Sequence, residues 1–518
     1  MASTWIYITL TMLLCVELGE SRTFRAAVLE HALHLPNTTS VVSRQQALAY
    51  VEPNLAEFER QAAIARSQSV DILVTPEDGI YGMGYKRAII RPYMETIPDP
   101  RHVTWNPCTT SADIPNVEVQ RRLSCMARDN SLYLVANYGD IQPCSVRNDP
   151  NCPSDGHYQY NTDIVFDPNG TLIARYHKKH LFFEYQFDEP TEAENVVFET
   201  PFGRFGVFTC FDIMFEKPAI SLIEDLSVGN IVFPTAWIDA LPLLAAVQFH
   251  SAFAMGMGVN VLAANIHRPG YRFHGSGIYT PDGAAVYYYN DTIGTGGGKL
   301  LIADIEIMDK AARRPVEDQP KPDSKMLSVH QFEFKSFLFN DLFNFVSLRD
   351  PHADEIKVCH NALCCHATYT ADLNEGDMYA LGAFDGLHTY EGQYYLQICT
   401  MLKCANSSHS SCGTPTLDAS SIFSNIDIRG TFSTPYIFPE VLMSDTGSLA
   451  LAQTQLSFKN GSLVTKNPLD LPLLSATLFG RKYSWDNGND YDKASGCCGR
   501  DSILLSIYLP LVLTLFLK

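Results

Sequence analysis

A regular alternation of strand-like and helix-like segments occupies roughly the first 300 residues and leaves few folds open. Residues 23–29 and 70–75 have the composition of buried strands. Between these two segments, Ser43 and Gln46 have the capping-box spacing that is typical of the start of a helix. The alternation continues to residue 307, with a turn at 167–170 that is typical of a hairpin. Repeated β–α–β order with hairpins predicts a layered α/β domain over residues 22–310.

The pattern changes after about residue 310. Residues 311–328 begin with a run rich in Pro, Arg, Lys and Asp, which is typical of a linker. Beyond it the apolar segments are short and β-prone, and Gly and Asn turns separate them. We therefore expect a second, mostly β domain over residues 329–485, stabilised by disulfides.

Both ends of the chain carry processing signals. Residues 1–21 contain a short apolar run followed by Gly19 and Ser21, which predicts a cleaved signal peptide. Residues 486–518 combine small residues, a polar spacer and a terminal apolar run, the pattern of a GPI-attachment signal. A transmembrane tail is the alternative, but the run is short and contains Pro510. We expect a GPI-anchored protein on the extracellular face of the plasma membrane.

The cysteine count is odd once the ends are removed. Of 14 cysteines, Cys15 leaves with the leader and Cys497 and Cys498 leave with the tail. The remainder are Cys108, Cys125, Cys144, Cys152, Cys210, Cys359, Cys364, Cys365, Cys399, Cys404 and Cys412. In an oxidising compartment at least one of these stays unpaired or bridges to another chain. Two pairs, 144/152 and 404/412, are close enough to form small loops; the other pairings stay open.

Two further features concern partners. Five Asn-x-Ser/Thr triplets fit a secreted glycoprotein, at Asn37, Asn169, Asn290, Asn406 and Asn460. The net charge of −19 argues against nucleic acid, because phosphate binding needs a basic surface. We expect a small-molecule partner instead, with no metal or cofactor.

Three polar residues each follow a predicted strand: Glu77, Lys178 and Cys210. Ligands gather where strands end in open α/β sheets, so the three side chains are expected to meet. Taken singly, each has an ordinary explanation, as a turn carboxylate, a solvated lysine or a buried thiol. Together with the odd cysteine count they indicate a nucleophilic site.

The three groups suit hydrolysis of an amide. Glu77 takes the thiol proton of Cys210, and Lys178 and the helix after Cys210 are expected to favour the thiolate. Lys178 and the backbone N–H of Phe211 stabilise the oxyanion that forms on attack. Glu77 then protonates the leaving amine, and water releases the acid from an acyl-thioester. Trp237 and Phe249 are candidates to line the acyl pocket.

Three sequence blocks resemble the signature blocks of the nitrilase, or carbon–nitrogen hydrolase, superfamily: VTPEDGIYG (74–82), ARYHKKHLFFE (174–184) and FGVFTCFDIMF (205–215). A later segment, YALGAFDGLHTYEGQYYLQIC (379–399), is similar to the vanin and biotinidase branch. The resemblance implies a four-layer αββα domain. It also implies Glu77 as proton acceptor, Lys178 as proton donor and transition-state stabiliser, Cys210 as nucleophile, and Glu184 as a supporting carboxylate.

Within this branch two substrates compete. Vanins cleave pantetheine to pantothenate and cysteamine, whereas biotinidases release biotin from biocytin. The GPI-like tail resembles vanins and favours pantetheine, although PRHVTWNPC (100–108) and LFFEYQFD (181–188) look closer to biotinidase.

Two alternatives from other classes stay open. A catalytically idle adhesion glycoprotein would be supported if Cys210 formed a disulfide. A thiol protease would need a Cys–His pair, and the sequence places Glu77, not a His, at that position.

Overall fold

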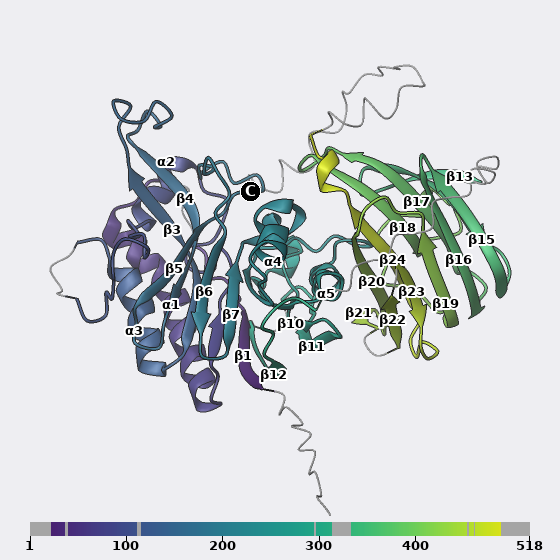
Figure 1. Cartoon of the computed structure of the whole chain (residues 1–518), viewed down its shortest axis with the longest axis horizontal. Helices are drawn as coiled ribbons and strands as arrows, with labels where there is room; N and C mark the ends of the chain where they lie inside the picture. Colours follow the sequence, from purple (N-terminus) through teal and green to yellow (C-terminus); the bar gives the residue numbers. More distant parts are fainter. Residues whose placement is uncertain are drawn as a thin grey trace, which may run out of the picture.

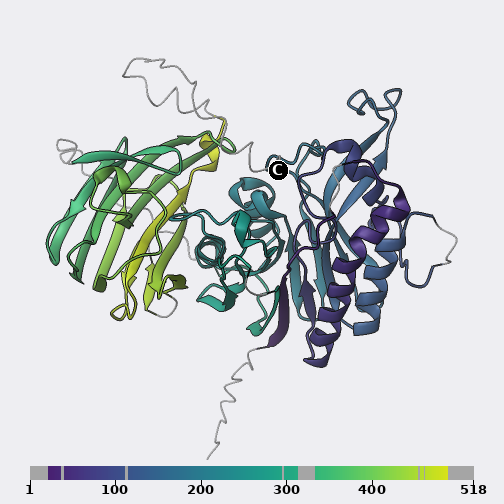
Figure 2. The ribbon, with the colours of Figure 1, turned by 180° about the vertical axis from the view of Figure 1, so that it is seen from behind.

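The computed structural model describes residues 22–36, 40–110, 115–294, 297–312, 333–452, 455–459 and 461–487. The predicted leader and tail, the sequons at Asn37 and Asn460, and most of the predicted linker lie outside these residues. Two domains lie side by side, an α/β domain and a β-rich domain (Figures 1 and 2).

The first domain contains two six-stranded sheets packed face to face. The first sheet has the order β12 (Lys299–Glu306), β1 (Thr23–Glu30), β2 (Ile72–Val74), β3 (Tyr133–Pro143), β4 (His157–Phe166) and β5 (Leu172–His177). The second has the order β11 (Gly283–Tyr288), β10 (Ser276–Thr280), β9 (Asn260–Ala264), β8 (Asn230–Pro234), β7 (Gly203–Val207) and β6 (Val196–Thr200). Each sheet has a parallel centre, β1–β2–β3 in one and β7–β8–β9 in the other.

Helices cover the outer face of each sheet. Helices α1 (Arg44–Ser67) and α3 (Glu118–Asn130) share an apolar core with the first sheet, and α4 (Ser221–Glu224) and α5 (Ala246–Met257) share one with the second. A short helix, α2 (Arg87–Ile90), follows α1 and β2. The layer order is α, β, β, α, which confirms the predicted fold class.

The start of α1 follows the predicted capping box. The Gln46 backbone N–H donates to Ser43 Oγ at 3.3 Å, and the Ser43 backbone N–H donates back to the Gln46 side chain, at Oε1, at 3.0 Å. Helix α5 begins at Ala246. The Gln248 side chain explains this, because it accepts from Ala245 N–H at 3.2 Å and donates to Pro242 carbonyl at 2.8 Å, which fixes the first turn.

The second domain is a sandwich of two antiparallel sheets, as expected for a mostly β domain. The larger has the order β13 (Phe334–Leu338), β14 (Asp341–Leu348), β17 (Met378–His388), β18 (Tyr394–Cys404), β24 (Leu473–Arg481), β20 (Tyr436–Asp445) and β21 (Ser448–Leu451). The smaller has the order β15 (His352–His360), β16 (Leu363–Asp372), β19 (Ile422–Gly430), β23 (Ser462–Thr465) and β22 (Leu456–Lys459).

Helix α5 joins the cores of the two domains. Figures 1 and 2 show α4 and α5 between the sheets of the first domain and the green and yellow strands of the second. The Phe253 ring packs 5.4 Å from that of Phe438 on β20, and the Phe249 ring lies 5.3 Å from that of Phe479 on β24. Because these rings are fully buried, the docking of the domains is part of the hydrophobic core.

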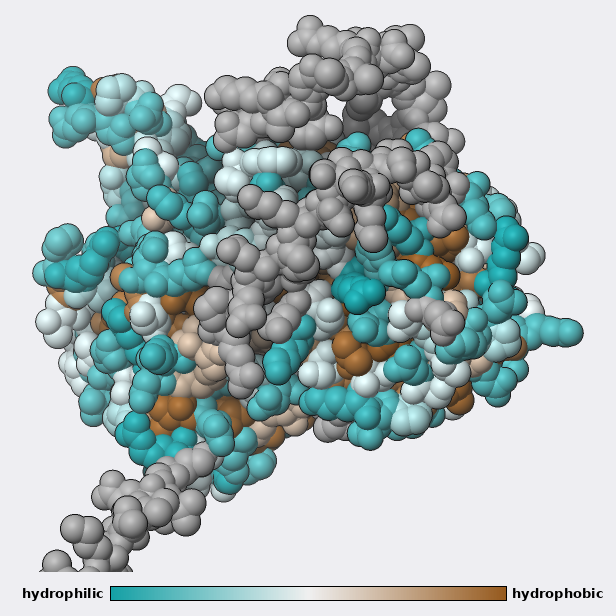
Figure 3. Space-filling model, turned by 45° about the vertical axis from the view of Figure 1, so that its right-hand side comes forward, coloured by the Kyte–Doolittle hydropathy of each residue, from teal (hydrophilic) through white to brown (hydrophobic). Residues whose placement is uncertain are grey.

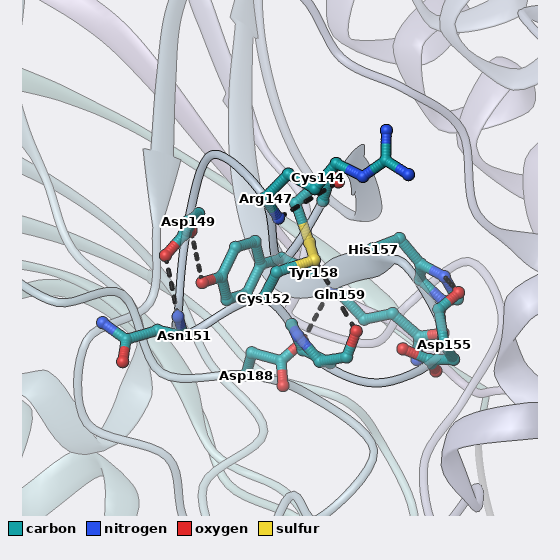
Figure 4. The surroundings of a disulfide bond; sticks show 12 residues. Cys144, Arg147, Asp149, Asn151, Cys152, Asp155, His157, Tyr158, Gln159 and Asp188 are labelled. Carbon is teal, nitrogen blue, oxygen red and sulfur yellow. Dashed lines mark hydrogen bonds and ion pairs between the residues drawn. A yellow bond between two sulfur atoms is a disulfide. The ribbon is translucent and has the colours of Figure 1, made fainter.

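Five disulfides form in the described residues: Cys108–Cys125, Cys144–Cys152, Cys359–Cys364, Cys365–Cys399 and Cys404–Cys412. Both short loops expected from the sequence are among them. Figure 4 shows the Cys144–Cys152 loop between β3 and β4, where Asp149 accepts from the Tyr158 hydroxyl at 2.7 Å. Among the cysteines that the structure describes, Cys210 alone is free, which identifies the unpaired thiol of the odd count.

None of the helices in the described part of the chain has the length and apolar character needed to cross a bilayer. On the face shown in Figure 3, hydrophobic residues occur in separate groups between hydrophilic ones.

Candidate active site

The structure brings the predicted site residues together from both sheets of the first domain. Glu77 and Lys178 follow β2 and β5 of the first sheet, and Cys210 follows β7 of the second. All three line one small cavity of about 60 Å³, together with Glu184. The site therefore lies where the ends of the two sheets face each other.

Lys178 lies between two carboxylates. Its Nζ donates to Glu77 Oε1 at 2.6 Å and forms a short ion pair with Glu184. The Lys178 side chain is only 1% exposed and that of Glu77 only 2%. Burial lowers the pKa of Lys178, but Glu184 and Glu77 raise it more, so the net pKa is well above its usual value. Lys178 is therefore a fixed ammonium group.

Hydrogen bonds from Asn161 and Ala236 orient the two carboxylates. Asn161 Nδ2 donates to Glu77 Oε1 at 2.7 Å and to Glu184 Oε1 at 2.6 Å. The Ala236 backbone N–H donates to the other Glu77 oxygen, Oε2, at 2.8 Å. Glu184 therefore lies in the site, beside the Lys178 ammonium group and the Asn161 amide.

Cys210 occupies a strained turn. Its φ of 46° lies in the left-handed region, which a residue with a Cβ adopts at a cost. A short 3₁₀ helix, η2 (Cys210–Met214), begins at this residue. The turn is held because Thr209 Oγ1 donates to Asp163 Oδ2 at 2.6 Å and the Thr209 N–H donates to Asp212 Oδ2 at 3.2 Å. Such strand-to-helix turns present a nucleophile at the end of a sheet.

The thiol is protonated at rest, which differs from the expectation that Lys178 and the following helix favour the thiolate. Burial raises the pKa of Cys210 and the Glu77 carboxylate raises it further; Lys178 lowers it by less, and the net pKa is well above its usual value. The helix contributes little because η2 is a five-residue 3₁₀ segment. The thiol proton must therefore leave during attack on a substrate.

Phe211 follows Cys210 in the first turn of η2. Backbone N–H groups in the first turn of a helix have no acceptor within the helix, so the Phe211 N–H is suited to hold an oxyanion. Its ring is buried and packs 5.2 Å from Phe182 and 6.3 Å from Tyr394 of the second domain.

A second, larger cavity opens beside Cys210. It has a volume of about 400 Å³, and residues of both domains line it, among them Phe182, Trp237 and Tyr390. Phe249 is not part of this wall: it stacks behind Trp237 at 5.7 Å, in the core between the domains. A hollow of about 990 Å³ around Glu95 and Trp105 contains none of the predicted site residues.

Comparison with known proteins identifies the family. A family model described as Carbon-nitrogen hydrolase matches residues 39–284, and one described as Vanin C-terminal domain matches residues 332–486. The pantetheinase of Canis lupus familiaris is 46% identical over 98% of both chains, and that of Homo sapiens is 47% identical over 95% of both. The chain belongs to the vanin family of carbon–nitrogen hydrolases. The Mus musculus biotinidase is 41% identical over 90% of this chain and 94% of its own.

Membership of this family confirms the branch predicted from the sequence blocks. It also makes the protein an enzyme that acts on carbon–nitrogen bonds of amides. The free thiol, the fixed ammonium group and the buried carboxylate belong to the domain that the carbon–nitrogen hydrolase model covers.

The sequence analysis missed a network of buried polar side chains next to the turn that carries Cys210. Asp163 accepts from Asn137 Nδ2 at 2.9 Å as well as from Thr209, and burial raises the pKa of Asp163 to about 8. Asp212 accepts from the Tyr176 hydroxyl at 2.7 Å, and burial raises its pKa to about 7. The sequence does carry a signal for this network. Asn161 and Asp163 lie two positions apart on β4, so both point to the same side of the sheet, just before the apolar end of the strand.

The second domain also contacts the turn that carries the nucleophile. Arg481, fully buried at the end of β24, donates from Nε to the Met214 carbonyl at 2.9 Å and from Nη2 to Asp486 Oδ2 at 2.8 Å. At Gly392 a Cβ would lie 2.9 Å from the Phe211 ring, so only glycine allows this approach. These contacts join the vanin C-terminal domain to Phe211 and Met214 of η2.

Proposed function

We propose that this vanin-family enzyme is a pantetheinase, which hydrolyses the amide of pantetheine to pantothenate and cysteamine through an acyl-enzyme on Cys210. The free thiol beside the Lys178–Glu77 ion pair carries the chemical part of this proposal. The choice of substrate is supported by five pantetheinases that are 46–48% identical to this chain, against 39–41% for two biotinidases.

The first half of the reaction forms the thioester. The Cys210 thiol gives its proton to Glu77 as its sulfur attacks the amide carbonyl carbon. The Lys178 ammonium group and the Phe211 N–H stabilise the negative charge on the carbonyl oxygen. Glu77 then passes the proton to the amide nitrogen, the carbon–nitrogen bond breaks, and cysteamine leaves.

The second half releases the acid. Glu77 takes a proton from water, and the resulting hydroxide attacks the thioester carbon. The carbon–sulfur bond breaks, pantothenate leaves, and the proton returns to the thiolate of Cys210. Glu184 has a supporting role, since its ion pair with Lys178 keeps the ammonium group charged and in place through both halves.

The test compares two amides. Cysteamine release from pantetheine and biotin release from biocytin are measured with the wild-type enzyme and with Cys210→Ala. We expect cysteamine release that is lost in the variant, and little biotin release. Faster biotin release would identify a biotinidase-type amidase, and equal activity in the two proteins would contradict the mechanism.

A catalytically idle adhesion glycoprotein fits the site poorly. A disulfide at Cys210 would have supported it, and Cys210 is free. A thiol protease, which needs a Cys–His pair, is disfavoured because the described residues that line the small cavity with Cys210 include the Glu77 carboxylate and no histidine.

We also propose that the protein is a glycoprotein held on the cell surface by a GPI anchor. The proposal rests on the apolar segments at the two ends and on the five disulfides, which are typical of secreted proteins. Asn169 and Asn406 are exposed and Asn290 is half-buried, so all three are within reach of a glycosyltransferase. Release from intact cells by phosphatidylinositol-specific phospholipase C supports the anchor, and retention contradicts it.

A further inference from the structure

Two cavities meet at Cys210. Both are lined by Cys210, Phe182, Phe183, Ala236 and Ile238. The small one also contains the Glu77, Lys178 and Glu184 side chains, whereas the large one extends to the second domain. An amide bound at Cys210 therefore has one arm in each. The small cavity has a volume of about 60 Å³ and the large one about 400 Å³. The shorter arm of the substrate therefore fits the small cavity, and the longer acyl arm fits the large one.

The wall of the large cavity is mostly aromatic and aliphatic, with two charged residues, Arg272 and Glu391. Arg272 is exposed, so water screens its charge. Glu391 comes from the second domain, in the segment between β17 and β18, and its side chain is only 7% exposed. A carboxylate this buried interacts strongly with whatever occupies the cavity.

The Glu391 carboxylate is held in a fixed orientation. Its Oε2 lies 2.8 Å from His388 Nε2, and its Oε1 accepts a short hydrogen bond from the Tyr394 hydroxyl. His388 Nδ1 lies 2.8 Å from Asp341 Oδ2, and the ring stacks between Phe339 at 5.0 Å and Tyr394 at 4.7 Å.

This arrangement keeps His388 protonated at neutral pH. Burial lowers the pKa of His388, but Asp341 and Glu391 raise it more, to about 9. The imidazolium donates to both carboxylates at neutral pH, so Glu391 presents acceptors only. Each of its oxygens keeps a lone pair beyond the bond that it already accepts.

We propose that Glu391 binds the hydroxyl end of the acyl chain, and that it makes the enzyme favour neutral, hydroxylated acyl groups over those that end in a phosphate. The proposal rests on the proposed pantetheinase function, since it concerns the acyl arm of that substrate. A hydroxyl donates to the free lone pairs of Glu391, while the aromatic wall packs against the carbon atoms of the chain. A terminal phosphate brings like charge to a buried carboxylate, which is unfavourable.

The residues around Glu391 have positioning roles. His388 contacts the carboxylate from the protein side, and Asp341 orients His388 in turn, whereas Tyr394 lines the cavity and its hydroxyl donates to the same carboxylate. The hydrogen bonds from His388 and from the Tyr394 hydroxyl act on the substrate through Glu391. Their replacement should therefore change the same kinetic parameter as replacement of Glu391, but by less.

The experiment compares Glu391→Gln with Glu375→Gln, a matched change at an exposed position of the same domain. Four amides are used: pantetheine, its analogue without the terminal hydroxyl, 4′-phosphopantetheine and N-acetylcysteamine. For Glu391→Gln we expect kcat/KM on pantetheine to fall about tenfold, mainly through KM, because a hydrogen bond to a charged group is lost. The value for 4′-phosphopantetheine should rise about tenfold, because a like charge is removed.

The other two substrates serve as internal controls. N-acetylcysteamine has no acyl arm that reaches Glu391, and the deoxy analogue lacks the donor, so Glu391→Gln should leave both unchanged. Unchanged N-acetylcysteamine hydrolysis also shows that the variant folds. Should Glu391→Gln fail to fold, Tyr394→Phe provides a milder loss with the same expected pattern.

The outcomes are distinguishable. If the wild-type enzyme cleaves pantetheine but Glu391→Gln changes kcat/KM equally for all four substrates, only the Glu391 proposal is overturned. No pantetheine cleavage by the wild-type enzyme would overturn the proposed function together with it. The selective pattern, absent in Glu375→Gln, supports both.

Discussion

Lys178 Nζ donates to Glu77 Oε1 across 2.6 Å, although β5 and β2, which these residues follow, are separated by two strands of the sheet. Asn161, on the intervening β4, donates to Glu77 and to the second carboxylate, Glu184, and so joins the two ends. The pair is almost completely buried, so its charges interact without screening by water. This ion pair is the structural centre of the site.

Removal of the Lys178 ammonium group should affect folding as well as catalysis. Lys178→Ala leaves two buried carboxylates without a cation, which typically costs about 3–5 kcal/mol of unfolding free energy. Lys179→Ala is the control, because the Lys179 side chain is 20% exposed and its ion pair with Glu189 lies at the surface. Urea unfolding should separate the two variants; equal stability would show that the ion pair is not needed for the fold.

The ionisation of the thiol should depend on Glu77. Because the Glu77 carboxylate raises the pKa of Cys210, Glu77→Gln should lower that pKa and increase the thiolate fraction at a given pH, while hydrolysis is lost. The measurement is ultraviolet titration of the thiolate, with Cys210→Ala as the blank. A titration midpoint that stays the same or rises in Glu77→Gln would contradict the electrostatic account.

Asp163 predicts a specific pH dependence of stability. Its pKa is raised from 3.8 to about 8 in the folded protein, so the folded state holds a proton that the unfolded state has lost between these values. The contribution of Asp163 to the free energy of unfolding is therefore fully present below pH 4. It is lost as the pH rises towards 8, at up to about 1.4 kcal/mol per pH unit. Asp163→Asn should flatten the pH dependence of the melting temperature over this window, and an unchanged slope would argue against a neutral Asp163.

The contact between Arg481 and the nucleophile turn should matter for stability. Arg481→Ala leaves the Met214 carbonyl and the Asp486 carboxylate without their donor in a buried site, at a cost of about 3 kcal/mol or more. Lys482→Ala is the matched control, since Lys482 Nζ donates to Ser433 Oγ nearer the surface. Equal melting temperatures for the two variants would contradict the role given to Arg481.

The sequence predicted the parts of this protein that depend on local pattern. Glu77, Lys178 and Cys210 could be found because each follows a strand whose apolar run is clear, and the layered fold follows from the order of the same strands. The odd cysteine count predicted an unpaired thiol, and the position of Cys210 after a strand, together with Glu77 and Lys178, indicated which one. Strand β6 was missed, because Val196–Thr200 has few buried residues and pairs only with β7 in the second sheet.

Features that depend on packing between distant segments were out of reach. Glu391 enters the large cavity through the docking of the second domain, which no local pattern encodes. The raised pKa of Cys210 arises mainly from burial, whereas Lys178 and the helix expected after Cys210 had suggested a lowered value. The side chain of Gln248 decided where α5 begins, through bonds to Pro242 and Ala245.

The acyl-enzyme itself is the most direct test of the central claim. Wild-type enzyme turning over pantetheine is quenched in acid within one turnover, digested, and examined by mass spectrometry. The peptide containing Cys210 should carry the pantothenoyl group as a thioester, and Cys210→Ala should carry none. Turnover by Cys210→Ala at the wild-type rate, or the acyl group on another residue, would contradict the mechanism.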